Sequence, residues 1–317
     1  MPQSYTATQT FNREIGKQIL VLRCAAPEME CVIVPDLGFN VISWTYGGKE
    51  LIGYDREALV QPGLTGCPML FPFPNRVRDA AYAFGGKQYR QVKNGRDIVL
   101  HGLVWDEPFQ SKLTTGDDCA RAQGFVAFDN PHLLEGYPFP CILTLRCELN
   151  STGLSISYHV QNAGTATMPF GFAIHPYFVR VDGEATQVQI PAATRYETTP
   201  DLLPTGVLLP TAGTRYNLSS PTPASGQEFD DVFCELSGPC AILHPQSKLR
   251  VTLNATPDFQ HVVYYSTATL PRFFCVENQT CSTNAINISQ RCKTSNLLTL
   301  APGKTHSGRV DMVVTAL

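Results

Sequence analysis

Two side chains in this sequence are suited to moving protons to and from a small substrate. Glu277 lies in RFFCVENQT (272–280), directly after five residues of which four are apolar. Burial there would raise its pKa and make it a stronger base than a solvated carboxylate. His175 lies in the apolar and aromatic run GFAIHPYF (171–178). The plain structural alternatives are a surface glutamate at a strand end and a core histidine bonded to the backbone.

Other polar residues are suited to binding hydroxyl groups. Asn75 and Arg76 follow the proline-rich start of segment 68–84, where the backbone is held rigidly. A guanidinium presents a fork of donors, and an amide offers both a donor and an acceptor. His101 precedes Gly102, a residue at which the backbone can approach a ligand closely. A loop asparagine, a surface arginine and a core histidine are the alternatives.

A pair of carboxylates stands between phenylalanines in FDDVF (229–233). Because neighbouring residues of a strand face opposite sides, one of Asp230 and Asp231 is expected to point inward. The alternative is that the pair simply ends a loop. A metal site is also chemically possible, although the spacing of its acceptable ligands carries no ligand signature. Those ligands are His101, His175, Asp230 and Glu277.

The elements that must position these residues are predicted to be strands. Short segments with alternating or continuous β-branched and aromatic residues recur along the chain. They are 18–24, 30–35, 143–149, 154–160, 261–266 and 310–316. The 24 glycines and 24 prolines are spread between them as turn formers. Long amphipathic helices are hard to find, so the pattern predicts an all-β fold, a large antiparallel sandwich or barrel.

Composition limits the class of protein. The chain has 317 residues, 43% of them hydrophobic and 16% charged, which suits one compact domain over 1–317. A net charge of −3 offers no electrostatic footprint for nucleic acid or an anionic membrane. Eleven cysteines without close CxxC pairs favour reduced thiols in the cytoplasm. The Pro/Ser/Thr-rich segment 202–230 is consistent with a domain boundary or with a long loop beside a binding site.

Taken in order, the motifs resemble a known family. FPNRVRDAAYAFGGKQYRQVKN, LHG, HPYF, FDDVF and FCVENQTCSTNAIN match the order and spacing found in the aldose 1-epimerases, the galactose mutarotase family, over about residues 66–287. The resemblance implies a one-domain β-supersandwich. It also implies an isomerase that interconverts the α and β anomers of a free hexose by acid/base ring opening and closure. That reaction needs no metal and no organic cofactor.

The resemblance also assigns roles to residues. Glu277 takes the place of the family's base and His175, in its protonated form, that of its acid. A neighbouring carboxylate would keep this imidazole cationic near neutral pH. Asn75, Arg76 and His101 would bind and polarise the sugar. Asp230 fits the family's hydroxyl-binding aspartate better than Asp231 does, because a phenylalanine, Phe233, follows it three residues later.

The expected partner is a small-molecule sugar bound by a monomer or homodimer, with no nucleic acid and no membrane. The natural sugar stays open, because Ile174 and Pro176 flank the histidine where better-characterised mutarotases carry Asn-His-x-Tyr-Phe. A hexose-6-phosphate epimerase is one alternative, with Arg78, Lys87 and Arg96 as its basic residues. The others are a glycosidase or lyase that pairs Asp230 with Glu277, and a sugar-binding protein without catalysis.

Overall fold

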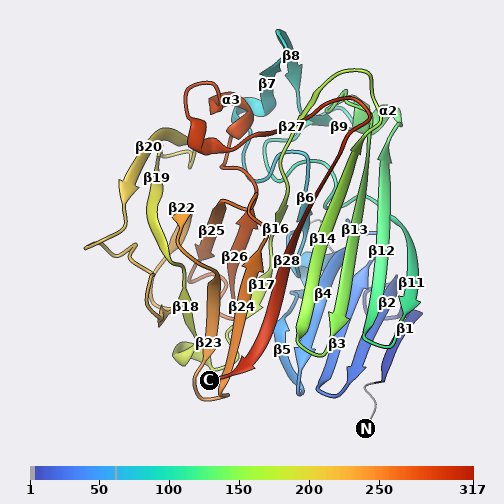
Figure 1. The fold of residues 1–317 in the computed structure, drawn as a ribbon, viewed down its shortest axis with the longest axis vertical. Coiled ribbons are helices and arrows are strands. Elements are labelled where there is room, and N and C mark those ends of the chain that lie inside the picture. Colours follow the sequence, from blue (N-terminus) through green and yellow to red (C-terminus); the bar gives the residue numbers. More distant parts are fainter. Residues whose placement is uncertain (1–3, 61–62) are drawn as a thin grey trace.

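The computed structural model describes residues 4–60 and 63–317. Antiparallel strands dominate it, in two large sheets that lie face to face (Figure 1). In the described part of the chain the first sheet follows the strand order β1 (Tyr5–Asn12), β2 (Lys17–Ala25), β3 (Glu28–Val34), β4 (Asn40–Tyr46), β5 (Lys49–Ile52), β17 (Tyr177–Val179), β26 (Phe273–Gln279), β25 (His261–Ser266), β22 (Phe229–Leu236), β19 (Ala192–Thr198) and β20 (Pro204–Pro210). β16 (Ala173–Ile174) joins it by pairing with β26 and with β6 (Met69–Leu70).

The second sheet covers the inner face of the first. Its order is β11 (Gln110–Thr115), β12 (Cys119–Phe128), β13 (Cys141–Asn150), β14 (Gly153–Asn162), β28 (Thr305–Ala316), β24 (Leu249–Ala255), β23 (Cys240–His244), β18 (Gln187–Gln189) and β21 (Thr222–Pro223). The all-β prediction and the large antiparallel sandwich are therefore confirmed. Each of the six predicted segments overlaps a strand of the structure, and 261–266 coincides with β25.

Smaller elements decorate the two sheets. Three short strand pairs are formed by β7 (Ala81–Phe84) with β8 (Lys87–Arg90), β9 (Val92–Lys93) with β10 (Arg96–Asp97), and β15 (Met168–Phe170) with β27 (Leu298–Leu300). The helices are α1 (Arg56–Val60), α2 (Pro131–Leu134) and α3 (Ala285–Ile288), with 3₁₀ turns at Arg78–Ala80, Gly183–Ala185 and Lys293–Ser295. Among the described residues, no helix has the length and apolar character needed to cross a bilayer.

Alternating burial explains why the long strands form. Along β13, Leu143, Leu145 and Leu149 are buried while their neighbours face outward or lie half-buried. Burying one such leucine contributes about 1.5–3 kcal/mol. These side chains belong to a hydrophobic cluster that also contains Leu20 and Leu22 of β2 in the opposite sheet. The core therefore lies between the two sheets and holds them together.

β26 departs from this alternation because both of its faces are covered. All seven of its residues are buried. Phe274 and Val276 pack into the core between the sheets, whereas Cys275 packs with Tyr177 on the other face. Side chains two residues apart share a face, so Glu277 follows Cys275 onto the face away from the main core. This is why the sequence shows a continuous apolar run before a buried carboxylate.

Two loops reach over the sheet at this place. The chain forms one bridge between Phe71 and Gly102 and another between Arg76 and Leu100. Gly102 has φ of 71°, and an added Cβ would lie 2.3 Å from the carbonyl oxygen of Phe71. The close approach of the backbone at Gly102 is thus made with the chain itself.

Candidate active site

A cavity of about 230 Å³ opens beside β26. All six residues predicted from the sequence line it, although they come from segments spread over two hundred positions. The lining consists of Leu64, Asn75, Arg76, Leu100, His101, His175, Tyr177, Asp230, Tyr265 and Glu277. The fold therefore brings the predicted acid, base and hydroxyl-binding residues to one place.

The predicted acid and base face each other in this cavity. Nε2 of His175 lies 3.3 Å from Oε1 of Glu277, and both side chains are buried. His175 sits between β16 and β17, where its own amide donates to the carbonyl of Pro68 at 3.0 Å. Its ring stacks parallel to that of Tyr177, with centroids 5.0 Å apart. These contacts fix the imidazole so that one nitrogen points at the carboxylate.

Burial decides where the proton of this pair resides. It raises the pKa of Glu277 well above the ordinary value, and the charge of Asp230 adds to this, while the Gln279 amide and Arg76 oppose it. Burial also lowers the pKa of His175 to about 4. The pair therefore holds one proton on Glu277, beside a neutral imidazole. The expectation that His175 is cationic at rest is wrong, because desolvation outweighs the nearby carboxyl group.

Two residues that line the cavity have strained backbones. Asn75 has φ of 57° and His101 has φ of 65°, a left-handed conformation that costs about 1–2 kcal/mol for a residue with a side chain. The amide of His101 donates to the carbonyl of Asn75 at 2.8 Å and so ties the two loops together. Such strain is found most often at functional sites, where it places side chains that a relaxed backbone would direct elsewhere.

His101 stands close to the acid–base pair. Its ring centroid lies 5.1 Å from that of His175, in an edge-to-face arrangement. Burial lowers the pKa of His101 well below the ordinary value, and His175 and Arg76 lower it further. His101 is therefore neutral, and it can offer a ligand one N–H or one lone pair.

Arg76 and Asp230 form the polar rim. Nη2 of Arg76 lies 3.3 Å from Oδ2 of Asp230, and its Nη1 donates to Oδ1 of Asn75 at 3.0 Å. Both charged side chains stay about a quarter exposed, so they are available to a ligand. Asp231 lies outside the cavity and pairs with Arg195 at 3.3 Å. Of the two aspartates, Asp230 thus lines the site, as the motif offset predicted.

A wider groove of about 610 Å³ adjoins the cavity and shares Asp230 and Tyr265 with it. Leu202, Leu209 and Arg215 contribute to its wall. Segment 202–230, expected as a domain boundary or a long loop, contains the strands β20 and β21 and contributes residues to the wall of this groove. The basic residues considered for a phosphate pocket, Arg78, Lys87 and Arg96, are exposed and do not line the cavity.

The sequence interpretation missed several residues of the site. Tyr177 belongs to the HPYF motif, which by itself does not indicate that its ring lines the cavity. Tyr265 pairs with Asp230 across β25 and β22, so it could be found only from the strand register. Gln279, two residues after the proposed base, donates to Glu277 at 3.0 Å. The alternation of side chains between the two faces of β26 is the sequence signal that could have identified Gln279.

Among the residues that the structure describes, one group of side chains has ligand atoms close enough together to hold a metal ion. It consists of His175, Cys275 and Glu277, whose ligand atoms lie within 4.8 Å of one another. Cys275 is fully buried and does not line the cavity. His101 and Asp230, the other ligands considered from the sequence, are not part of this set.

Comparison with known proteins agrees with this geometry. The family model for aldose 1-epimerase matches residues 21–312. The chain therefore belongs to the aldose 1-epimerase family.

The individual proteins compared below share at most 30% sequence identity with this chain. The chain is 30% identical over 247 residues to the uncharacterized protein YihR of Escherichia coli, which covers 75% of each chain. It is 28% identical over 153 residues to mouse galactose mutarotase, covering 46% of this chain and 43% of the mouse protein.

A galactose mutarotase-like protein from Clostridium acetobutylicum has the same fold, with a TM-score of 0.86, 20% identity and 99% of each chain covered. Galactose 1-epimerase from Lactobacillus acidophilus superposes with a TM-score of 0.78, 16% identity and 99% of each chain covered. Both structures support the β-supersandwich.

Proposed function

We propose that this protein is an aldose 1-epimerase that interconverts the α and β anomers of a free, unphosphorylated hexose. The observation that carries the proposal is the pair of His175 and Glu277, 3.3 Å apart in a buried cavity that Asn75, Arg76 and Asp230 rim with hydroxyl-binding groups. Ring opening requires a proton to leave the C1 hydroxyl and another to reach the ring oxygen. One base and one acid suffice for this, and they must lie close together.

The reaction begins with the proton of the pair on His175. Glu277 removes the proton of the C1 hydroxyl while His175 donates its proton to the ring oxygen, and the C1–O bond of the ring breaks. Rotation about the C1–C2 bond then exposes the other face of the aldehyde. Reversal of both transfers closes the ring as the other anomer. The pair ends with one proton, as it began, so proton balance requires no further group.

The protonation state that burial favours in the pair of His175 and Glu277 supports this cycle. After ring opening the proton lies on Glu277 and His175 is neutral, which is the arrangement that burial favours. The protein thus stabilises the open-chain stage relative to the ion pair that precedes it. His101 and Arg76 are placed to stabilise charge that develops on the ring oxygen.

The charges around the site favour a neutral sugar. Apart from Asp230 on the shared wall, the groove contains Asp231, Glu197 and Glu228, set against two arginines. Arg195 is engaged by Asp231, and Arg215 donates to the carbonyl of Glu228 at 2.9 Å. A phosphate group would meet four carboxylates set against two arginines in this groove, an excess of negative charge that disfavours a hexose 6-phosphate as substrate.

Polarimetry of freshly dissolved sugars tests the proposal. We expect accelerated mutarotation of glucose or galactose, and a much smaller acceleration for their 6-phosphates. Binding measured by calorimetry without any acceleration would make the protein a sugar-binding protein instead. Release of reducing ends from an oligosaccharide would make it a glycosidase or lyase. The eleven free cysteines lead us to place the reaction in the reducing cytosol.

A further inference from the structure

Gln279 is placed to act on the proposed base. It lies two residues after Glu277 on β26, on the same face of the strand, and is fully buried. Its Nε2 donates to Oε2 of Glu277 at 3.0 Å. The other carboxylate oxygen, Oε1, is the one that lies 3.3 Å from Nε2 of His175. The two oxygens of the carboxyl group therefore have separate partners, and only Oε1 belongs to the acid–base pair.

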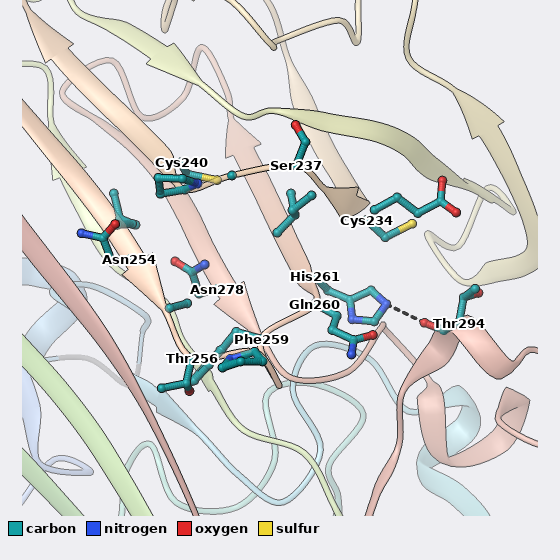
Figure 2. Close-up of a pocket in the computed structure, with 17 residues that line it drawn as sticks. Cys234, Ser237, Cys240, Asn254, Thr256, Phe259, Gln260, His261, Asn278 and Thr294 are labelled. Atoms are coloured by element: carbon teal, nitrogen blue, oxygen red, sulfur yellow. Dashed lines mark hydrogen bonds between the residues drawn. The ribbon is translucent and has the colours of Figure 1, made fainter.

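The neighbouring strand places a histidine beside Gln279. His261 is its cross-strand partner in β25. Figure 2 shows the His261 ring turned toward Thr294, and Nε2 of His261 lies 2.9 Å from that residue's carbonyl oxygen. A carbonyl oxygen can only accept, so Nε2 carries the hydrogen and Nδ1 the lone pair.

His261 also stays neutral, because burial lowers its pKa to about 4. An amide turned to place its oxygen against Glu277 would lose the hydrogen bond that Nε2 of Gln279 donates to Oε2 of Glu277. Such a turn would also set that oxygen against a carboxylate oxygen. The NH₂ end of Gln279 consequently faces Glu277 whenever the carboxyl group is ionised.

The hydrogen bond from Gln279 fixes the orientation of the Glu277 carboxyl group, which the contact with His175 alone does not fix. The terminal torsion of a glutamate is broad, so a buried carboxyl group without a second contact could rotate its oxygens out of line. A hydrogen bond to Oε2 fixes the plane and directs Oε1 into the cavity. A donor on a carboxylate also favours its ionised form, which is the form that removes the C1 proton.

We propose that Gln279 is a positioning residue for the reaction, which fixes the plane of the Glu277 carboxyl group and favours its ionised form. The inference rests on the proposed function for its kinetic consequences. Its physical content, the effect of Gln279 on the proton affinity of Glu277, can be measured without turnover.

The test replaces Gln279 by methionine, which has a similar length and cannot donate. The matched control is Asn278→Leu, a change at the adjacent residue, whose side chain lies on the opposite face of β26 and lines the pocket in Figure 2. Because hydrogen bonds to charged groups are stronger than neutral ones, we expect Gln279→Met to lower kcat by about 10–100-fold with little change in KM. The alkaline limb of its pH profile should move to higher pH, while the control keeps the wild-type limbs.

Infrared titration of the Glu277 carboxyl band in the sugar-free protein separates this inference from the proposed function. The titration midpoint should rise in Gln279→Met and rise further in Gln279→Glu, where a like charge faces Glu277. Gln279→Glu also keeps the side-chain size, so it serves if the methionine variant does not fold. Unchanged titration midpoints of Glu277 in both Gln279 variants, or equal shifts of the midpoint in Asn278→Leu, would overturn the role of Gln279. Absent mutarotation with shifted midpoints would overturn the proposed function alone.

Discussion

Replacing Glu277 by glutamine removes the proposed base and preserves its shape. A positioned general base contributes about 10²- to 10⁴-fold to a rate. The full effect is expected here, because the other carboxylate among the lining residues, Asp230, is engaged by Arg76 at 3.3 Å. The new amide can still accept the hydrogen bond from Gln279. We therefore expect Glu277→Gln to fold normally, to bind hexose and to lose at least ~100-fold in the rate of mutarotation.

The assay combines polarimetry of fresh glucose and galactose with calorimetric measurement of sugar binding. Glu197→Gln is the matched control, because Glu197 lies in the adjoining groove and does not line the cavity. The control should keep the wild-type rate. A Glu277→Gln protein that turns over at a near-normal rate would refute the acid–base assignment. Loss of sugar binding together with the rate would show instead that Glu277 serves to bind the substrate.

Three further predictions follow from the same geometry. His175→Asn should also lower the rate of mutarotation by at least ~100-fold. The pH profile of the wild-type kcat/KM should show an acid limb near pH 4, from the lowered pKa of His175, and an alkaline limb from the raised pKa of Glu277. An acid limb near pH 6.5 would contradict this assignment. Activity should survive dialysis against a chelator, and a loss restored by Zn²⁺ would contradict the metal-free reaction. His261 is uncharged when folded and has its pKa lowered to about 4, so the folded state binds fewer protons than the unfolded state between pH 6.5 and 4. His261 alone should therefore contribute about 3 kcal/mol to the stability lost over that range, and urea unfolding of His261→Gln should show a correspondingly smaller loss than the wild type.

The strands could be predicted because their burial follows short-range patterns. Alternation in segments such as β13 and β14 is written directly in the sequence, since one face meets the core and the other meets solvent. The continuous apolar run of β26 predicts a buried strand, but the sequence does not show which segments cover its two faces. One of those faces is closed by Tyr177, which lies far from β26 in the sequence, and by Tyr265 of the neighbouring strand β25.

The site residues were found by their ordered motifs, and the structure explains why single motifs were weak. Asn75 and His101 depend on left-handed backbone conformations and on a bridge between two loops, neither of which a local pattern reveals. The charge of His175 could not be predicted either. It depends on how completely distant segments exclude water, and burial reversed the expected cationic state.

Burial also explains how a glutamate and a histidine can supply an acid at neutral pH. In water a glutamate has a pKa of about 4.3 and a histidine about 6.5, so above neutral pH an exposed pair would hold almost no proton. In the cavity, the raised pKa of Glu277 keeps one proton on the pair. Since that proton can lie on either partner, 3.3 Å apart, the same two groups can serve ring opening and closure. The acid of the reaction thus depends on the exclusion of water as much as on the identity of His175.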